Sequence, residues 1–186
     1  GAWFGFEQEY FFYQDGKPYL EVLFWIPVDS LSKNINADGS FHAKAEVLLT
    51  LSRDRKVFRA DRFMLRSPDL KEPKPMLHVV RWQVPEGVQL LQADISDAAY
   101  PERSVSLVDS LEVVPMTSSP ALSDIQLFAM VSSSGKSDDP LSKNGFHYEP
   151  LAWNMMSRNL QVLQVYVETY GMTAMQSSGY VMRYRI

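Results

Sequence analysis

The chain has 186 residues, of which 46% are hydrophobic, and its 18 basic and 22 acidic residues leave a net charge of −4. This composition is typical of a folded globular protein with one large or two small domains, and not of a disordered chain. The acidic balance disfavours a nucleic-acid partner, and the absence of cysteine excludes disulfides, thiolate metal sites and cysteine nucleophiles.

The N-terminal stretch AWFGFEQEYFFY is aromatic but is interrupted by Glu7 and Glu9, so it is neither a membrane span nor a secretory signal. No apolar run in the sequence approaches the roughly 20 residues that cross a bilayer as a helix. Gly1 stands where a methionine would start the chain, which indicates a processed or engineered start from which any targeting segment has been removed.

The next segment, PYLEVLFWIPVD at 18–29, is predicted to be a strand with two apolar faces, since Glu21 is its only charge between Tyr19 and Val28. One face carries Leu20, Val22, Phe24 and Ile26 and fits the core of a sandwich. The opposite face carries Glu21, Leu23 and Trp25 and is too apolar to stand free in water. We expect it to be covered from within the chain, by a neighbouring domain or the segment 3–13, with a separate partner as the alternative.

The segment 41–51 shows the clearest alternation of the sequence, because the odd positions from Phe41 to Leu51 are apolar and the even ones are mostly polar. It is followed by the polar stretch SRDRK and by a second alternating run at 57–65. Two alternating runs joined in this way predict a β-hairpin, although the favoured Asn-Gly turn is missing.

Further strands are predicted at 77–84, 88–95, 105–114, 125–131, 160–170 and 180–186, separated by turn-forming stretches such as SPDLKEPKP and VPEG. Helical signals are poor. LVDSLEVV and WNMMSRNLQVL lack caps and a sustained apolar stripe. Many short strands at this spacing predict an all-β sandwich fold.

The stretch 116–122 is the predicted linker between a first sandwich at 1–115 and a second unit at 123–186. The second unit has few predicted strands for an independent sandwich. Either it borrows a strand from the N-terminal segment or the natural protein continues beyond Ile186, and the C-terminal stretch GYVMRYRI favours a truncated second unit.

No motif in the sequence specifies a reaction. The histidines His42, His78 and His147 form no metal-ligand motif, and no GxSxG elbow or complete phosphate-binding loop occurs. Asp138 and Asp139 could supply oxygens to calcium, but paired acids in a loop are usually only solvated. The pairs Asp94 with Asp97 and Glu7 with Glu9 could be drawn as acid/base pairs, although only their separation in space would decide that. We therefore expect no cofactor, no resident metal and no catalytic residue.

Aromatic residues make up 12% of the chain. Most are expected in the core, Trp82 among them, because aromatic side chains favour strands and bury large areas. Tyr100, Tyr148 and Trp153 are the least easily buried, with Tyr148 predicted on a short edge strand in FHYEPLAW. These three form the predicted recognition surface, and aromatic rings that stack on sugars make carbohydrate a second possible ligand.

Two long stretches resemble bacterial GWxTD-domain-containing proteins. The first consists of PYLEVLFWIPVDSL followed by FHAKAEVLLTLSRDRKVFRADRFML. Its first strand ends at Val22 to Pro27 in a pattern similar to that of the family. The second runs from LSDIQLFAMV to VETYGM, with an Asn-Gly pair after Lys143, a region around Pro150 and an ending of the form aromatic-x-glutamate-x-tyrosine. The matched stretches span most of the chain, but the Gly-Trp-x-Thr-Asp motif itself is absent.

The resemblance implies tandem immunoglobulin-like sandwiches exported from the cytoplasm of a Gram-negative bacterium, with no established activity and no functional residues to carry over. The function that we predict is that of a non-catalytic binding or spacer module of the bacterial envelope, periplasmic or at the cell surface, that contacts another protein. A carbohydrate-binding module is the alternative. A hydrolase with a site dispersed in the sequence is the third hypothesis.

Overall fold

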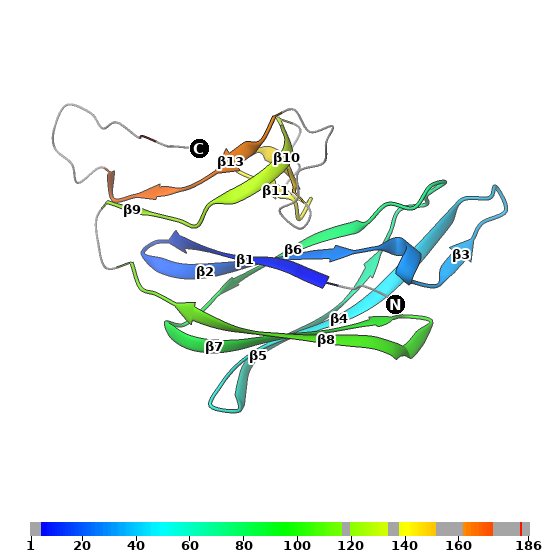
Figure 1. Ribbon diagram of the computed structural model, residues 1–186, viewed down its shortest axis with the longest axis horizontal. Coiled ribbons are helices and arrows are strands. Elements are labelled where there is room, and N and C mark those ends of the chain that lie inside the picture. The colour runs from blue at the N-terminus through cyan, green and yellow to red at the C-terminus, as the bar shows by residue number, and fades with distance from the viewer. Residues whose placement is uncertain (1–4, 117–119, 134–137, 152–161, 173–182, 184–186) are drawn as a thin grey trace.

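The computed structural model describes residues 5–116, 120–133, 138–151, 162–172 and 183. In this part of the chain the fold is all-β, and its antiparallel strands form three layers (Figure 1). Helical structure includes a single 3-10 turn, η1 (Val28–Ser30), and no helix in the described part of the chain has the length and apolarity to span a membrane. The prediction of an all-β, sandwich-like fold is confirmed.

The middle layer is a three-stranded sheet in the order β1-β2-β6. It consists of β1 (Gly5–Gln14), β2 (Lys17–Ile26) and β6 (Met76–Gln83). The turn between β1 and β2 is formed by Asp15 and Gly16, whose φ angles of 51° and 73° are those of a type I′ turn. An Asp-Gly pair favours this turn, so the hairpin follows directly from the local sequence.

The lower layer is a larger, curved sheet. It contains β3 (Lys33–Ile35), β4 (Phe41–Arg53), β7 (Gly87–Asp97) and β8 (Tyr100–Val113) in that order, and β5 (Lys56–Arg66) also pairs with β4. The predicted hairpin at 41–65 is therefore confirmed. Its turn places Asp54 and Arg55 at φ angles of 50° and 65°. Aspartate tolerates this conformation, whereas arginine does not adopt it without cost.

The core lies between these two sheets and follows the period of two seen in the sequence. Odd-numbered residues of β4 and even-numbered residues of β2 point into it, and Trp82 closes one side with only 1% of its surface exposed. The fully buried members from the two sheets include Leu20, Val22, Phe24, Ile26, Ala43, Ala45, Val47, Leu49 and Leu51. The predicted inward face of β2 and the core position of Trp82 are confirmed.

The upper layer is the C-terminal unit (Figure 1). Its four-stranded sheet has the order β11-β12-β10-β13, from β10 (Gln126–Ser132), β11 (Ser142–Lys143), β12 (Phe146–Pro150) and β13 (Gln164–Tyr166), and β9 (Ala121–Leu122) pairs with β14 (Thr169–Tyr170). Where one strand was predicted at 160–170, the described residues form the two short strands β13 and β14. The predicted strand at 180–186 lies outside the described residues, apart from Arg183, which is not in a strand. β9 falls within the predicted linker.

The second face of β2 is covered by this upper layer. Glu21 and Leu23 expose only 2% and 1% of their surfaces. Glu21 and its neighbour Val79 line a narrow gap together with Phe128, Tyr148 and other residues of the C-terminal unit. The prediction of a cover from within the chain is confirmed, and the cover is the C-terminal unit.

Candidate functional site

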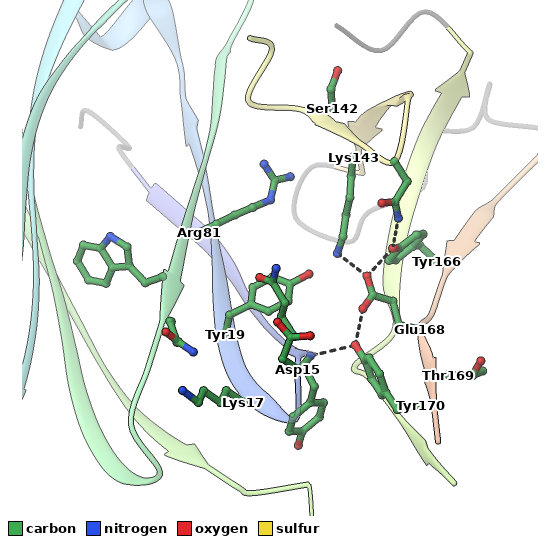
Figure 2. A pocket seen from close by; sticks show the side chains of 15 residues that line it. Asp15, Lys17, Tyr19, Arg81, Ser142, Lys143, Tyr166, Glu168, Thr169 and Tyr170 are labelled. Atoms are coloured by element: carbon green, nitrogen blue, oxygen red, sulfur yellow. Dashed lines mark hydrogen bonds and ion pairs between the residues drawn. The ribbon is translucent and has the colours of Figure 1, made fainter. Parts of the chain in front are cut away.

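A cleft of about 950 Å³ lies where the C-terminal unit meets the β1–β2 hairpin (Figure 2). It is bounded by β2 and β6 on one side and by the C-terminal unit on the other. Its lining is polar and rich in tyrosine, comprising Tyr13, Gln14, Asp15, Lys17, Tyr19, Arg81, Trp82, Gln83, Ser142, Lys143, Asn144, Tyr166, Glu168, Thr169 and Tyr170.

Two tight turns bring these residues together. The Asp15–Gly16 turn places Tyr13 and Tyr19 on adjacent strands at one wall of the cleft. The opposite wall depends on the turn between β11 and β12, where Asn144 and Gly145 have φ angles of 52° and 82°. This second type I′ turn holds Lys143 at the end of β11, from which its side chain reaches towards β2.

The side chain of Lys143 ends in a socket formed by two carboxylates and three aromatic rings. Its Nζ lies 3.1 Å from Glu21 Oε1 and 2.9 Å from Glu168 Oε1. The same atom lies 3.5 Å from the ring centroid of Phe12, with the rings of Tyr166 and Tyr19 at 4.7 and 5.3 Å. Only 14% of the lysine side chain is exposed, so these ion pairs and cation–π contacts are partly desolvated and stronger than surface ones.

Glu168 is the centre of a hydrogen-bond network inside the cleft (Figure 2). Tyr166 Oη donates to Glu168 Oε1 at 2.5 Å, Tyr170 Oη donates to Oε2, and the Tyr170 hydroxyl accepts the backbone N–H of Tyr13 at 3.0 Å. Burial alone would raise the pKa of Glu168, but the hydrogen bonds from both tyrosines and from Lys143 outweigh it and hold the pKa below its usual value. The carboxylate is therefore ionised at neutral pH.

The same environment keeps the tyrosines protonated. Burial, followed by the hydrogen bond to Glu168 and its negative charge, raises the pKa of both Tyr166 and Tyr170. The pKa of Tyr19 is raised by burial and then by the charges of Glu168 and Glu21. Phenol groups with raised pKa values are poor nucleophiles but good hydrogen-bond donors to a polar ligand.

The cleft is lined by two carboxylates, Asp15 and Glu168, and a glycosidase works with a pair of carboxyl groups. A glycosidase needs one of them as a general acid with a raised pKa. Glu168 has the opposite shift and is already bound by a cation and two hydroxyls. Glu168 is therefore held as a carboxylate and does not have the raised pKa of a general acid.

Of the three aromatic residues predicted for recognition, the structure describes Tyr100 and Tyr148. Tyr100 is 51% exposed at the start of β8, where the guanidinium of Arg103 lies 5.9 Å from its ring centroid. Tyr148 packs on Phe128 and on Tyr166, with centroid distances of 4.9 and 5.4 Å. The predicted edge position of its strand is wrong, because β12 lies between β11 and β10. Trp153 lies outside the described residues.

The histidines are not as isolated as the sequence suggests. His147 Nδ1 lies 2.5 Å from Asp139 Oδ2, and His42 Nδ1 lies 3.3 Å from Asp69 Oδ1. Burial, followed by the charge of Arg81, lowers the pKa of His78, so its ring is neutral where it packs against Phe63. No group of three or more acidic or histidine side chains suited to a metal ion occurs within the described ranges.

Three of the aspartates considered from the sequence as metal ligands or acid/base groups accept hydrogen bonds from neighbouring residues. Asp97 is buried and accepts hydrogen bonds from the backbone and hydroxyl of Ser32 at 2.8 and 2.7 Å. Asp94 is bound by the amide of Gln92. Asp139 accepts the N–H of Leu141 at 2.9 Å and so supports the loop before β11. The side chains of Glu7 and Glu9 lie outside the described part of the structure.

The tyrosine-lined cleft was not predicted from the sequence, although one signal for it exists. Tyr166, Glu168 and Tyr170 are spaced two residues apart, and this alternation places three polar aromatic or acidic groups on one side of an extended segment. Which residues they meet depends on the packing of the C-terminal unit on β2, which no local pattern encodes.

Comparison of the chain with models of known protein families, with curated proteins and with solved structures finds no match.

Proposed function

We propose that the chain is a non-catalytic binding or spacer module of a bacterial envelope protein, acting outside the cytoplasm and contacting another protein. The all-β, layered architecture supports this proposal, as does the resemblance of its two long stretches to GWxTD-domain-containing proteins. In the cleft the pKa of Glu168 is lowered and that of Tyr166 is raised, so the carboxylate stays charged and the phenol stays protonated, which agrees with binding more than with catalysis.

The observation that carries the proposal is the free outer edge of β5. Among the described strands, β5 pairs only with β4, and its 11 residues present an unpaired backbone edge. Val57, Phe58 and Met64 on this strand expose 54%, 44% and 52% of their surfaces. A long edge strand with exposed apolar side chains is the feature by which a sheet accepts a strand from a partner.

The opposite edge of the sandwich shows what a satisfied edge looks like in the same molecule. On β1, the backbone N–H of Phe11 donates to the carboxylate of Asp124 at 2.9 Å, and its carbonyl accepts the N–H of Asp124 at 3.2 Å. The segment before β10 thus occupies part of that edge. β5 has no such cover within the described residues.

Peptide display on the intact chain, followed by hydrogen exchange, tests the proposal. We expect selected peptides to slow the exchange of β5 amides and to leave those of β8, the edge strand at the other side of the sheet, unchanged. Selection of no peptide, or of peptides that protect β8 equally, would refute the proposed role of β5.

Carbohydrate binding in the cleft is the second candidate function, and the lining of the cleft favours it. Four tyrosine side chains line the cleft, those of Tyr13, Tyr19, Tyr166 and Tyr170, and sugars stack on such rings. The cleft is also lined by the side chains of Gln14, Asp15 and Gln83 and by the Tyr19 hydroxyl. These side-chain groups have no hydrogen-bond partner among the described residues. They are therefore available to sugar hydroxyls.

Affinity electrophoresis with a set of polysaccharides tests this candidate. Asp15→Asn keeps a residue that tolerates the positive φ of the turn and removes only the charge, and Gln83→Ala removes one free amide. Both should weaken retention by a binding polysaccharide. Tyr100→Ala is the matched control, because Tyr100 is exposed but does not line the cleft. Equal retardation of all variants, or none of the wild type, would exclude the cleft as a sugar site.

A further inference from the structure

The β4–β5 hairpin is strongly basic in an acidic protein. Between Arg53 and Arg66 the sequence has six basic and two acidic residues, a net charge of +4, whereas the whole chain has a net charge of −4. The rest of the molecule therefore carries the negative charge, and the free edge lies in its positive part.

The charges on β5 alternate with apolar groups along one face. Phe63 and Leu65 point towards the core, where the ring centroid of Phe63 lies 5.9 Å from that of Phe24. Residues of the other parity, Phe58, Arg62 and Met64, consequently face away from the core. The side chain of Arg62 is 67% exposed, so this outer face presents ring, guanidinium and thioether to solvent.

The ion pairs within the hairpin region do not neutralise this face. Arg62 Nε lies 3.4 Å from Glu46 and Arg66 lies 2.9 Å from Asp69, but all four side chains are at least one-third exposed. Ion pairs in such positions contribute little and exchange readily with other partners. Arg55 and Lys56, at the turn, have no ion-pair partner among the described residues.

From this charge pattern we infer that the partner of β5 is an extended segment in which acidic and apolar side chains alternate, bound as an added strand. The inference rests on the proposed function of β5 and adds the chemistry of its partner. Acidic groups in register with Arg62 and the turn residues would form cross-strand pairs, and apolar groups would cover Phe58 and Met64.

A second copy of the chain is the wrong occupant for the same reason. Pairing of two β5 edges would bring two segments of net charge +4 together, and like charges across neighbouring strands are destabilising. The basic residues thus oppose self-association while they attract an acidic strand.

Binding of synthetic peptides to the intact protein tests the inference by fluorescence anisotropy and hydrogen exchange. The probes are three ten-residue peptides in which valine alternates with glutamate, glutamine or lysine. We expect the glutamate peptide to bind most tightly, to protect β5 amides and to lose affinity as salt rises. The double variant Arg55→Glu/Lys56→Glu should weaken binding of the glutamate peptide about tenfold, mainly through slower association, because two attractive charges become repulsive.

The matched control is Lys71→Glu/Lys74→Glu, which makes the same change of charge at exposed positions of the loop after β5. It should leave binding within about twofold of the wild type. If the glutamine or lysine peptide protects β5 as well as the glutamate peptide does, the acidic partner is refuted and the strand-adding edge stands. If none of the peptides protects β5, both the inference and the proposed function fail.

Discussion

Replacing Lys143 by methionine is the sharpest test of how the C-terminal unit is held on the sandwich. Methionine keeps the aliphatic stem and removes the ammonium group. The substitution leaves Glu21 and Glu168, each within 3.1 Å of Lys143 Nζ in the native protein, without the cation between them. It also removes the cation–π contacts with Phe12, Tyr19 and Tyr166.

The expected loss of stability is about 3 kcal/mol. Removal of one partner from a buried ion pair costs on the order of 3–5 kcal/mol, because the other charge stays buried. The lower end applies here. Glu21 keeps Arg81 at 3.0 Å, and Glu168 keeps the hydrogen bonds from its two tyrosines.

Urea unfolding followed by tyrosine near-UV circular dichroism measures this loss, and hydrogen exchange of the β11–β12 amides locates it. The pH dependence adds a second signature. Since the folded-state pKa of Glu168 lies below the usual value of a glutamate, its contribution to stability is present above that usual value and is lost as pH falls through the folded pKa. The difference between wild type and Lys143→Met should therefore be largest at pH 7 and shrink towards pH 3.

Lys33→Met is the matched control. Lys33 Nζ also lies near one carboxylate, 2.5 Å from Asp29, and 4.8 Å from the ring centroid of Phe41, but this pair is exposed. Its loss should cost less than about 1 kcal/mol. Equal costs for the two substitutions, or a cost for Lys143→Met that does not change with pH, would refute the view of Lys143 as a buried link between the units.

Three further outcomes are expected. Asp97→Asn should cost about 2 kcal/mol in urea unfolding at pH 7, because the buried carboxylate accepts charge-assisted hydrogen bonds from Ser32. Burial raises the pKa of Asp97, but the hydrogen bonds outweigh burial and the net pKa lies below the usual value of an aspartate. The stabilisation is therefore present above that usual value and is lost on acidification, so the unfolding free energies of the two proteins should be closer at pH 3. An equal difference in unfolding free energy at pH 7 and pH 3 would contradict this. Arg55→Gly should raise the unfolding free energy by about 1 kcal/mol, since Arg55 has a φ of 65° that glycine adopts without strain; no gain would mean that the turn is not strained. The raised pKa values of Tyr166 and Tyr170 predict stability that is present below pH 10 and lost as pH rises above it, seen as tyrosine ionisation at 295 nm coinciding with loss of circular dichroism. Ionisation of every tyrosine well before unfolding would contradict that prediction.

The strands of the sandwich could be predicted because their signal is local. Alternation along 41–51 places Ala45, Val47 and Leu49 on one side of any extended chain, and burial of that side decides which face is inward. The apolar stretch of β2, in which Glu21 is the only charge after Tyr19, likewise predicts a cover on both faces. The C-terminal unit was less predictable, because its strands are short and its pairs, such as β9 with β14, join segments far apart in the chain.

The cleft and its charges could not be read from the sequence in this way. Lys143 and Glu21 are separated by 122 residues, and nothing near either one indicates the other. Local side-chain order dictates which residues become strands and which faces avoid water, since each residue's direction depends only on its own backbone. The socket around Lys143, the network at Glu168 and the free edge of β5 arise from how the layers are stacked, because the energy of a charge depends on the neighbours that stacking brings to it.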